Sequence, residues 1–208
     1  TAPSPTASNS TTLTCTTTTA ALTGGGGGTY AWSGPGIAAG ATTSAPTVNL
    51  PGTYVLTVTA ANGCTATAST AITQNTVVPV ANGTTSGTLT CSTTTITASA
   101  TTTTSPESYN WTGPGIVSGS VTGTITVNMP GAYNYIVTDV SNGCSTSGTL
   151  TVIQNTTAPS PTASNSSTLT CTTTTANLTG TGGGSYNWSG PGITAGATTS
   201  APTVNLPG

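Results

Sequence analysis

Hydrophobic side chains occur along this chain in short runs that alternate with polar positions, and the clearest run is Tyr54–Thr59. In an extended strand Tyr54, Leu56 and Val58 share one face, while the residues between them share the other. A hairpin turn is predicted at Asn62-Gly63, directly after this strand. The other strands of the first repeat are predicted at Thr11–Leu22, Thr29–Ser33, Val48–Leu50 and Thr65–Thr73.

Turn-forming residues separate these strands. Gly24–Gly28 predicts a loop and Gly34-Pro35-Gly36 predicts a turn, and similar signals recur every ~8–12 residues. No segment has the periodicity of a helix. About seven short strands per repeat is the pattern of a β-sandwich, so the sequence predicts an all-β fold.

Internal repetition divides the chain into domains. Residues 1–52 and 157–208 align without gaps at an offset of 156, with 46 of 52 positions identical. A more diverged copy lies between them and shares several motifs with both. The triplet Leu-Thr-Cys occurs at 13–15, 89–91 and 169–171. The predicted domains are 1–76 (first type), 77–156 (second type) and 157–208 (the N-terminal part of a repeated first type).

The third domain stops at Gly208, before the segment equivalent to Thr53–Ile72, so the sequence lacks its last two strands. We favour the explanation that the sequence is a window of a longer repetitive chain. The alternative is that a neighbouring molecule donates these strands, because a half-sandwich would expose an unpaired sheet edge. Pro79, Pro159 and Pro161 stiffen the short linkers, so tandem sandwiches in an elongated rod are expected.

Charge is nearly absent from this chain. It has no Lys, Arg or His, and its two acidic side chains are Glu107 and Asp139. Without cationic side chains nothing neutralises phosphates, which argues against nucleic-acid binding. Acid–base catalysis and metal binding also lack candidate residues, so we expect no enzyme activity, no metal site and no cofactor. No apolar run approaches the ~20 residues of a membrane span.

The five cysteines predict disulfide bonds and therefore an extracellular location. We predict the intradomain pairs Cys15–Cys64 and Cys91–Cys144, with Cys171 pairing near position ~220, beyond the last residue. A domain of this size has a marginal core. Closing a loop of about 50 residues is worth roughly 4 kcal/mol in the chain-entropy model. Reactive or redox-active thiols are the alternative interpretation.

Aromatic residues are few and occur at repeated positions. Trp32, Trp111 and Trp188 each follow a tyrosine by two residues, and a single indole can fill much of a small sandwich core. A stacking platform for sugars is the alternative role of these indoles. Tyr54 and Tyr133 are similar to the corner tyrosine of sandwich folds, which is a structural role.

Glycosylation sites are numerous in this sequence. Clustered threonines at Thr16–Thr19 and Thr101–Thr104 are candidates for O-glycosylation. The alternative is that threonine serves as a β-forming residue whose exposed hydroxyl replaces charge as the solubilising group. The Asn-x-Ser/Thr sequons are at Asn9, Asn82, Asn110, Asn155, Asn165, Asn177 and Asn187.

Three motifs together resemble a known group of proteins. They are Tyr-x-Trp-Ser/Thr-Gly-Pro-Gly-Ile (30–37, 109–116, 186–193), Pro-Gly-Thr/Ala-Tyr (51–54, 130–133) and Asn-Gly-Cys (62–64, 142–144). The chain resembles the immunoglobulin-like, PKD-like tandem repeats of giant secreted surface proteins and adhesins of Bacteroidota. Gliding-motility adhesin repeats are a looser relative. The resemblance covers essentially the whole chain, and it implies secretion to the surface and a role in a stalk or filament.

The expected function is therefore structural: a segment of a long extracellular fibre, either a surface filament or an adhesin stalk. Neighbouring copies in the fibre are the expected partners, because a chain with a net charge of −2 repels its neighbours little. The alternative is a binding module that recognises ice, a mineral or a polysaccharide through threonine-rich strand faces. Thr57 with Thr59, and Thr124 with Thr126, are the candidate pairs.

Overall fold

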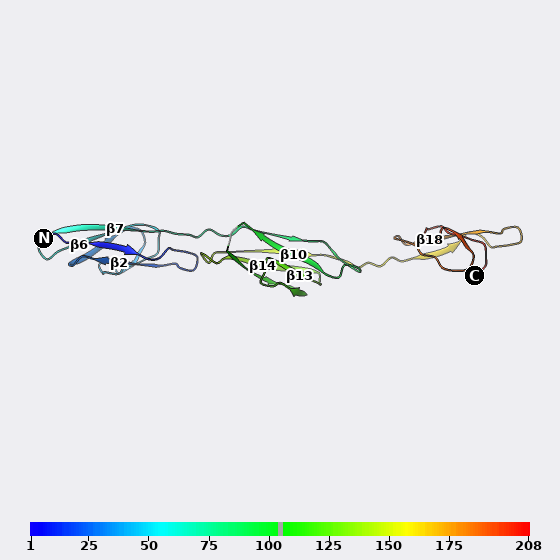
Figure 1. Cartoon of the computed structure of the whole chain (residues 1–208), viewed down its shortest axis with the longest axis horizontal. Coiled ribbons are helices and arrows are strands. Elements are labelled where there is room, and N and C mark those ends of the chain that lie inside the picture. The colour runs from blue at the N-terminus through cyan, green and yellow to red at the C-terminus, as the bar shows by residue number, and fades with distance from the viewer. Residues whose placement is uncertain (104–105) are drawn as a thin grey trace. The chain divides into compact units, whose positions relative to one another are not determined.

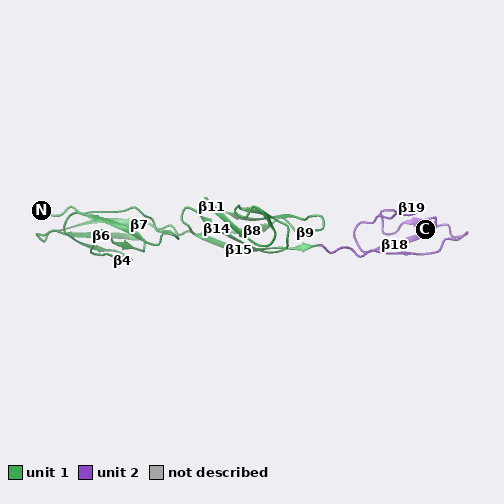
Figure 2. Ribbon diagram, turned by 90° about the horizontal axis from the view of Figure 1, so that it is seen from below, with its two compact units in different colours: residues 1–155 green, residues 156–208 purple. Residues whose placement is uncertain are grey.

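The computed structural model describes residues 1–103 and 106–208, so Thr104 of the Thr101–Thr104 cluster lies outside the described residues. Every regular element in the described residues is a β-strand (Figure 1). The chain forms two compact units, Thr1–Asn155 and Thr156–Gly208 (Figure 2). Within the described ranges there is no helix long and apolar enough to cross a membrane.

The first unit begins with a seven-stranded sandwich. One of its sheets has the order β1-β2-β5-β4 and the other has the order β3-β6-β7. Seven strands split in this order match the A-B-E-D and C-F-G sheets of a constant-type immunoglobulin domain, so the fold is all-β and immunoglobulin-like. The strands are β1 (Thr6–Asn9), β2 (Ala20–Gly25), β3 (Thr29–Ser33), β4 (Ile37–Ala39), β5 (Thr47–Val48), β6 (Gly52–Thr59) and β7 (Thr65–Ile72).

Alternation along β6 and β2 forms the core of this sandwich. Tyr54, Leu56 and Val58 of β6 are fully buried, and they face Leu22 of β2, which is also fully buried. Burying each such side chain stabilises the fold by about 1.5–3 kcal/mol. The buried residues are Leu13, Ala20, Leu22, Trp32, Val48, Tyr54, Leu56, Val58 and Ile72.

Two glycines that the sequence placed in a loop belong instead to β2. A Cβ atom at Gly24 would lie 2.7 Å from Cζ2 of Trp32 and 2.8 Å from Cδ2 of Leu56. Glycine is therefore required at this inward position because the indole fills the space that a side chain would take. The loop itself is confined to Gly26–Gly28, where all three residues have positive φ.

A second sandwich completes the first unit. Its sheets have the orders β12-β13-β10-β8 and β11-β14-β15, and β9 pairs in parallel with β16. It has a separate core that includes Trp111, Tyr133, Tyr135 and Val137. The strands are β8 (Ala81–Thr85), β9 (Leu89–Thr90), β10 (Ile96–Thr102), β11 (Glu107–Thr112), β12 (Ile116–Ser118), β13 (Thr124–Val127), β14 (Gly131–Asp139), β15 (Ser145–Val152) and β16 (Gln154–Asn155).

The second unit is a single sheet in the order β17-β18-β20-β19. These strands correspond to β1, β2, β5 and β4, and the described residues of this unit form no second sheet. Leu178 and Trp188 are consequently half-buried, whereas the equivalent Leu22 and Trp32 are buried. The strands are β17 (Thr162–Asn165), β18 (Ala176–Thr181), β19 (Ile193–Ala195) and β20 (Thr203–Val204).

Candidate functional site: a disulfide-bonded joint in the first unit

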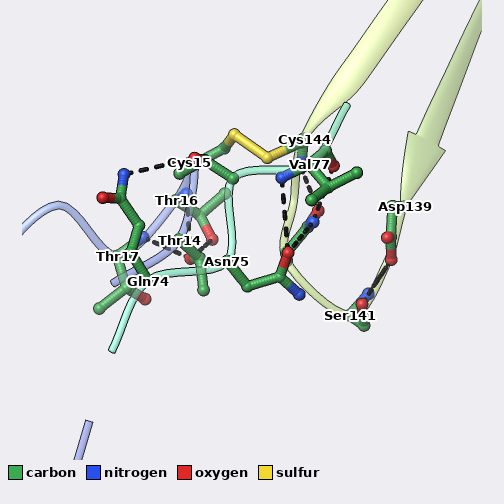
Figure 3. Close-up of a disulfide and its surroundings, with 12 residues drawn as sticks. Thr14, Cys15, Thr16, Thr17, Gln74, Asn75, Val77, Asp139, Ser141 and Cys144 are labelled. Carbon is green, nitrogen blue, oxygen red and sulfur yellow. Dashed lines mark hydrogen bonds between the residues drawn. A yellow bond between two sulfur atoms is a disulfide. The ribbon is translucent and has the colours of Figure 1, made fainter. Parts of the chain in front are cut away.

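A disulfide joins the two sandwiches of the first unit. Cys15, in the loop between β1 and β2, bonds to Cys144, in the hairpin between β14 and β15, and the Cα atoms are 5.1 Å apart (Figure 3). This separation lies in the usual range for disulfides. The predicted bonds Cys15–Cys64 and Cys91–Cys144 are therefore wrong, because Cys15 and Cys144 are bonded to each other.

The length of strand β7 explains this correction. Cys64 lies just before β7, whereas Leu13, two residues before Cys15, forms a bridge with Gln74 just after β7. Eight residues of strand span about 26 Å, far more than the ~7 Å that a disulfide can bridge between Cα atoms. Each sandwich thus carries its two cysteine positions at opposite ends, too far apart to bond to each other.

The second sandwich has the same arrangement. Cys91 follows β9, which pairs with β16 beyond the end of β15, while Cys144 precedes the start of β15. The predicted pair Cys91–Cys144 fails for the same reason as Cys15–Cys64.

Asn142 holds the joint by hydrogen bonds. Its side chain is 1% exposed, and its Nδ2 donates to Oδ1 of Asn75 at 3.1 Å and to the carbonyl of Val77 at 2.9 Å. Its Oδ1 accepts the backbone N–H of Cys144 at 2.8 Å. Asn75 and Val77 lie in the segment that links the sandwiches, so one buried amide ties the linker to the hairpin and orients Cys144 (Figure 3).

The loop that carries Cys15 packs closely on this hairpin. The Cys15 N–H donates to the carbonyl of Asn142 at 3.1 Å. A Cβ atom at Gly143 would lie 2.4 Å from Cγ2 of Thr16, and Gly143 has a φ of +71°. Glycine is required here for both its conformation and the close approach of Thr16. The loop is closed by its own turn, in which the Thr17 N–H donates to Oγ1 of Thr14 at 3.0 Å.

Asp139 shapes the hairpin between β14 and β15. Its Oδ1 accepts the hydroxyl of Ser141 at 2.6 Å and the N–H of Ser141 at 2.8 Å, and these bonds hold the pKa of Asp139 below its ordinary value. Glu107 is its direct partner in the β11–β14 register. The Tyr109 hydroxyl donates to Glu107 at 3.1 Å, and burial, followed by this carboxylate, raises the pKa of Tyr109.

The two acidic residues therefore meet, although they lie far apart in the sequence. A glycosidase-like pair needs one carboxyl whose pKa is raised so that it can act as an acid, whereas the pKa of Asp139 is lowered. No group of three or more His, Cys, Asp and Glu side chains able to hold a metal ion occurs among the residues the structure describes.

The lowered pKa of Asp139 gives a testable pH dependence. Its charged form is favoured in the folded state, so the stability it contributes is present above the unfolded pKa of ~4 and is lost as pH falls through the folded pKa. We expect the urea concentration at the unfolding midpoint to fall steeply only below about pH 4. Asp139→Asn keeps an acceptor for Ser141 but does not titrate, and should flatten this fall. An identical acid profile in both proteins would contradict the role of Asp139.

The role of Asn142 can be tested against its exposed repeat equivalent. Asn142→Ala leaves Asn75, Val77 and the N–H of Cys144 without a buried partner, and should lower the free energy of unfolding by about 2–3 kcal/mol. Asn62→Ala removes the same side chain from an exposed hairpin, and should cost under about 1 kcal/mol. Urea unfolding of the oxidised proteins measures both values. Equal losses would show that the joint gains nothing from this amide.

The tryptophans of the two sandwiches are buried in their cores. Trp32 and Trp111 are 6% and 3% exposed, and their indole N–H groups donate to Thr43 and Thr122 carbonyls at 3.0 and 2.9 Å. They are core residues, so they offer no stacking surface to a sugar. Trp188 makes the equivalent bond but remains half-buried.

The two corner tyrosines are also part of the core. Tyr54 and Tyr133 are fully buried, and each hydroxyl donates to a carbonyl four residues upstream at 2.7 Å, that of Leu50 or Met129. Tyr133 also donates to the carbonyl of Pro114. In each sandwich the hydrogen bond to the carbonyl four residues upstream fixes the chain as it enters β6 or β14. This is the role of the tyrosine corner in immunoglobulin-like sandwiches.

The sequon asparagines lie mostly on the surface. Asn9 is the exception: it is half-buried and its Nδ2, the atom that would carry a glycan, donates to Thr70 Oγ1 and to the Ala71 carbonyl at 2.8 Å each. The exposed sequon asparagines are Asn82, Asn110, Asn155, Asn165, Asn177 and Asn187.

Comparisons with known proteins identify no family for this chain. No protein-family model and no curated protein sequence matches the chain. Among solved structures, the three N-terminal domains of the Highly Immunogenic Outer Capsid protein (Hoc) of bacteriophage RB49 align over 80% of this chain with a TM-score of 0.42 and 16% identity. The chain spans 61% of that structure.

Two further solved structures also align over most of this chain at low sequence identity. Domains 4 and 5 of the S-layer protein SbsC align over 76% of this chain and 100% of their own, with a TM-score of 0.34 and 15% identity. The titin domains Z1Z2, solved in complex with telethonin, align over 76% and 100%, with a TM-score of 0.29 and 13% identity. These likenesses concern the fold alone.

Sequence reasoning missed the joint as a site. The signal was present in the repeats, because Leu-Thr-Cys and Asn-Gly-Cys recur together in both complete domains. Asn-Gly was interpreted only as a turn, so the buried amide of Asn142 and the close contact at Gly143 were not anticipated. Asn75 and Val77 carry no local signal, since they act through the backbone and an amide in an irregular linker.

Proposed function

We propose that this chain is a load-bearing structural segment of an extracellular fibre, as a surface filament or an adhesin stalk, with no catalytic role. The observation that carries the proposal is the joint, in which a disulfide and a buried amide lock consecutive sandwiches together. Domains within one chain usually meet in small interfaces that permit relative motion. A covalent bond at such an interface serves a protein that must hold its domains in line under tension.

The path of force through the bond supports this proposal. The disulfide has a sequence separation of 129, so a pull on the chain ends passes from Cys15 directly to Cys144. The 128 residues between them add no length while the bond is intact. Strands β2 to β14 are thereby shielded from extension, whereas β1, β15 and β16 lie outside the bridge.

An extracellular location and the sequence resemblance agree with this function. Disulfides persist outside the reducing cytosol, and a chain without Lys or Arg offers no site to trypsin-like proteases. The motifs that resemble Bacteroidota surface repeats imply the same location. Exposed sequons and threonine clusters would give such a fibre a glycosylated surface.

Immunoelectron microscopy of the producing cells tests the proposal. Antibodies raised against the folded first unit should label extracellular fibres or stalks along their length, at regular intervals that reflect the two-domain repeat. Labelling confined to the cell interior, or to dispersed particles in the medium, would refute the structural role.

A hydroxyl-bearing sheet face favours a second candidate function. On the outer face of β3-β6-β7, Thr29, Thr59 and Thr65 are register partners in one row, and Thr57 and Thr67 are partners in the next. Adjacent strands are spaced ~4.8 Å apart, so the hydroxyls form a regular array. We propose on this basis that the face can also adsorb to ice, a mineral or an insoluble polysaccharide.

Adsorption assays separate the two candidates. The double variant Thr57→Val and Thr67→Val keeps β-branched side chains but removes the central hydroxyls, and should abolish adsorption to whichever surface the protein binds. The pair Thr57→Ser and Thr67→Ser retains the hydroxyls and should preserve it. If the wild-type chain adsorbs to none of these three surfaces, the second candidate fails and the structural one is unaffected.

Self-association is the remaining part of the proposal. Strand donation would fill the open face of the second unit, where a cavity of about 460 Å³ is lined by Gly180, Tyr186 and Trp188. The strand pairs of the required type, β6–β7 and β14–β15, are each built into their own sandwich. A second copy would have to unfold a domain to donate one. We therefore propose that neighbouring copies associate in the fibre without exchanging strands.

A further inference from the structure

Each sandwich of the first unit has a seam where its first strand meets its last strand. β1 belongs to one sheet and lies beside β7 of the other, and β8 lies beside β15 in the same way. The first strand thus covers an edge of the opposite sheet. We call the contact of β1 with β7 the first seam and the contact of β8 with β15 the second seam. The side chains along the two seams differ.

The second seam is built around Tyr135, whose ring lies between a glycine on β8 and a glycine on β15. A Cβ atom at Gly83 of β8 would lie 2.7 Å from Cε1 of Tyr135 and 3.2 Å from Cδ2 of Leu150. A Cβ atom at Gly148 of β15 would overlap the Tyr135 hydroxyl. Both positions therefore require glycine while the tyrosine is present.

Leu56 occupies the position of Tyr135 in the first sandwich. On one side, each of these two residues is the register partner of the buried tryptophan of its own sandwich. On the other side, Leu56 pairs with Ala68, whereas Tyr135 pairs with Gly148. Because leucine is smaller than tyrosine, the last strand of the first sandwich carries alanine where β15 needs glycine.

The glycine next to this core residue also lies on a different strand in the two sandwiches. In the first sandwich it is Gly24 of β2, and its register partner is Ala7 of β1, which packs on the core. In the second sandwich the order is reversed, because Gly83 of β8 pairs with Ala100 of β10. A β1 strand in the second seam would place Ala7 against Tyr135, where the ring leaves no room for a methyl group.

A hydrogen bond distinguishes the first seam as well. Nδ2 of Asn9 on β1 donates to Oγ1 of Thr70 on β7 and to the carbonyl of Ala71, at 2.8 Å each. The equivalent of Thr70 on β15 is Leu150, which is buried and has no hydroxyl, and each of the two pairs with the corner tyrosine of its sandwich. A β1 strand in the second seam would therefore lose this bond and place an amide beside an apolar side chain, which is unfavourable.

We propose that each seam accepts only the first strand of its own domain type, and that this selectivity prevents strand exchange between neighbouring domains. First-type strands with the sequence Thr-Ala-Ser-Asn occur at 6–9 and 162–165, on both sides of the second sandwich in the sequence. Exchange is a characteristic failure of tandem repeats, because a short linker keeps the wrong strand at a high local concentration. The inference concerns folding, so it goes beyond the proposed fibre function and does not depend on it.

A double-mutant cycle in the full chain tests the fit of the second seam. Gly83→Ala should lower the folding equilibrium constant of the second sandwich about tenfold or more, because the added methyl group meets the ring of Tyr135. The same substitution should cost little in a Tyr135→Leu background, which has the leucine of the first seam. Gly87→Ala is the matched control, since a Cβ atom at Gly87 would meet nothing within 4 Å. Urea unfolding of the oxidised proteins measures all four variants.

Refolding tests strand exchange itself. The double variant Tyr135→Leu with Leu150→Thr gives the second seam the side chains that β1 fits. After unfolding in urea and refolding, hydrogen exchange with mass spectrometry should show two populations of this variant. In one of them residues 81–85 lose protection while residues 96–102 keep it, because a first-type strand has replaced β8. Wild-type protein should give a single population with β8 protected.

Tyr135→Phe with Leu150→Val is the matched control for the refolding experiment. It keeps the ring that requires glycine on β8 and an apolar side chain on β15, so it should refold as the wild type does.

Two results would overturn the inference. One is an equal loss for Gly83→Ala with and without Tyr135→Leu, because the glycine would then not serve the tyrosine. The other is a single population with β8 protected in the variant that carries Tyr135→Leu and Leu150→Thr, because the seams would then not select their strands. Neither result affects the proposed fibre function, which rests on the Cys15–Cys144 bond.

Discussion

Stretching the chain by its two ends is expected to extend only the residues outside the Cys15–Cys144 bridge. The 128 bridged residues can unfold, but they cannot add contour length while the disulfide holds. In Cys15→Ser the same residues enter the path of force. We expect their unfolding to release an additional ~420–460 Å, at about 3.3–3.6 Å per extended residue.

Single-molecule force measurements with handles at both termini would detect this difference directly. Wild-type protein with reductant should reproduce the long extension of Cys15→Ser, and its removal should restore the short one. Cys64→Ser is the matched control, since it removes an exposed thiol outside the observed bond and should leave the hidden length intact. Equal extensions in wild type and Cys15→Ser would mean that the joint carries no load.

The same substitution should lower equilibrium stability. Closing a loop of this length is worth up to roughly 5 kcal/mol in the chain-entropy model. The full amount applies only when both sandwiches unfold together, because a folded partner already shortens the loop. A urea transition that separates into two steps in Cys15→Ser, and remains single in the wild type, is the expected signature of the lost coupling.

The sequence was informative wherever alternation and repetition determine structure. Thr29–Ser33 is β3 as predicted, and the predicted strand at Tyr54–Thr59 is the main part of β6. The sandwich class followed from the same pattern, because alternation over short runs buries one face of each strand. The strand predicted at Thr11–Leu22 differs from the structure, which has a single bridge at Leu13 and the start of β2 in this segment. The threonines between them form the turn of the joint instead.

The joint could not be predicted because its partners are distant in sequence. Cys15 has two equally repeated hairpin cysteines available, and choosing between them requires the direction of β7 relative to Leu13. A strand of eight residues carries its ends about 26 Å apart, so the nearer cysteine in sequence is the farther one in space. Once Leu13 is known to bridge to Gln74, just after β7, Cys64 is out of reach of Cys15 and the bond must reach another domain.

Replacing Trp111 by alanine is expected to remove a large share of the stability of the second sandwich. The indole is 3% exposed, its ring centroid lies 5.1 Å from that of Tyr135, and its N–H donates to the carbonyl of Thr122. Removing a buried tryptophan costs about 3–5 kcal/mol. A domain of this size has only about 4–12 kcal/mol of stability, so one substitution removes a large share of it.

Trp188→Ala is the matched control for this prediction. The indole makes the same bond to a carbonyl at 2.9 Å but is half-buried, so its removal should cost about 1 kcal/mol or less. Urea unfolding followed by far-ultraviolet circular dichroism measures both variants. Similar losses at the two positions would contradict the difference in packing between the second sandwich and the second unit.

The Trp111 substitution should also weaken the joint. Cys144 is 1% exposed and lies in the hairpin between β14 and β15, and β14 pairs with the strand that carries Trp111. Cys15 is exposed, so glutathione can attack its sulfur in the folded protein, whereas attack on the Cys144 sulfur requires the sandwich to open. We expect the mixed disulfide of glutathione with Cys144 to form at least about tenfold faster in Trp111→Ala than in Trp188→Ala, because each 1.4 kcal/mol lost from a domain raises its open population tenfold. Equal rates at Cys144 would show that its sulfur is exposed by local motion of the hairpin alone, and that the core does not protect it.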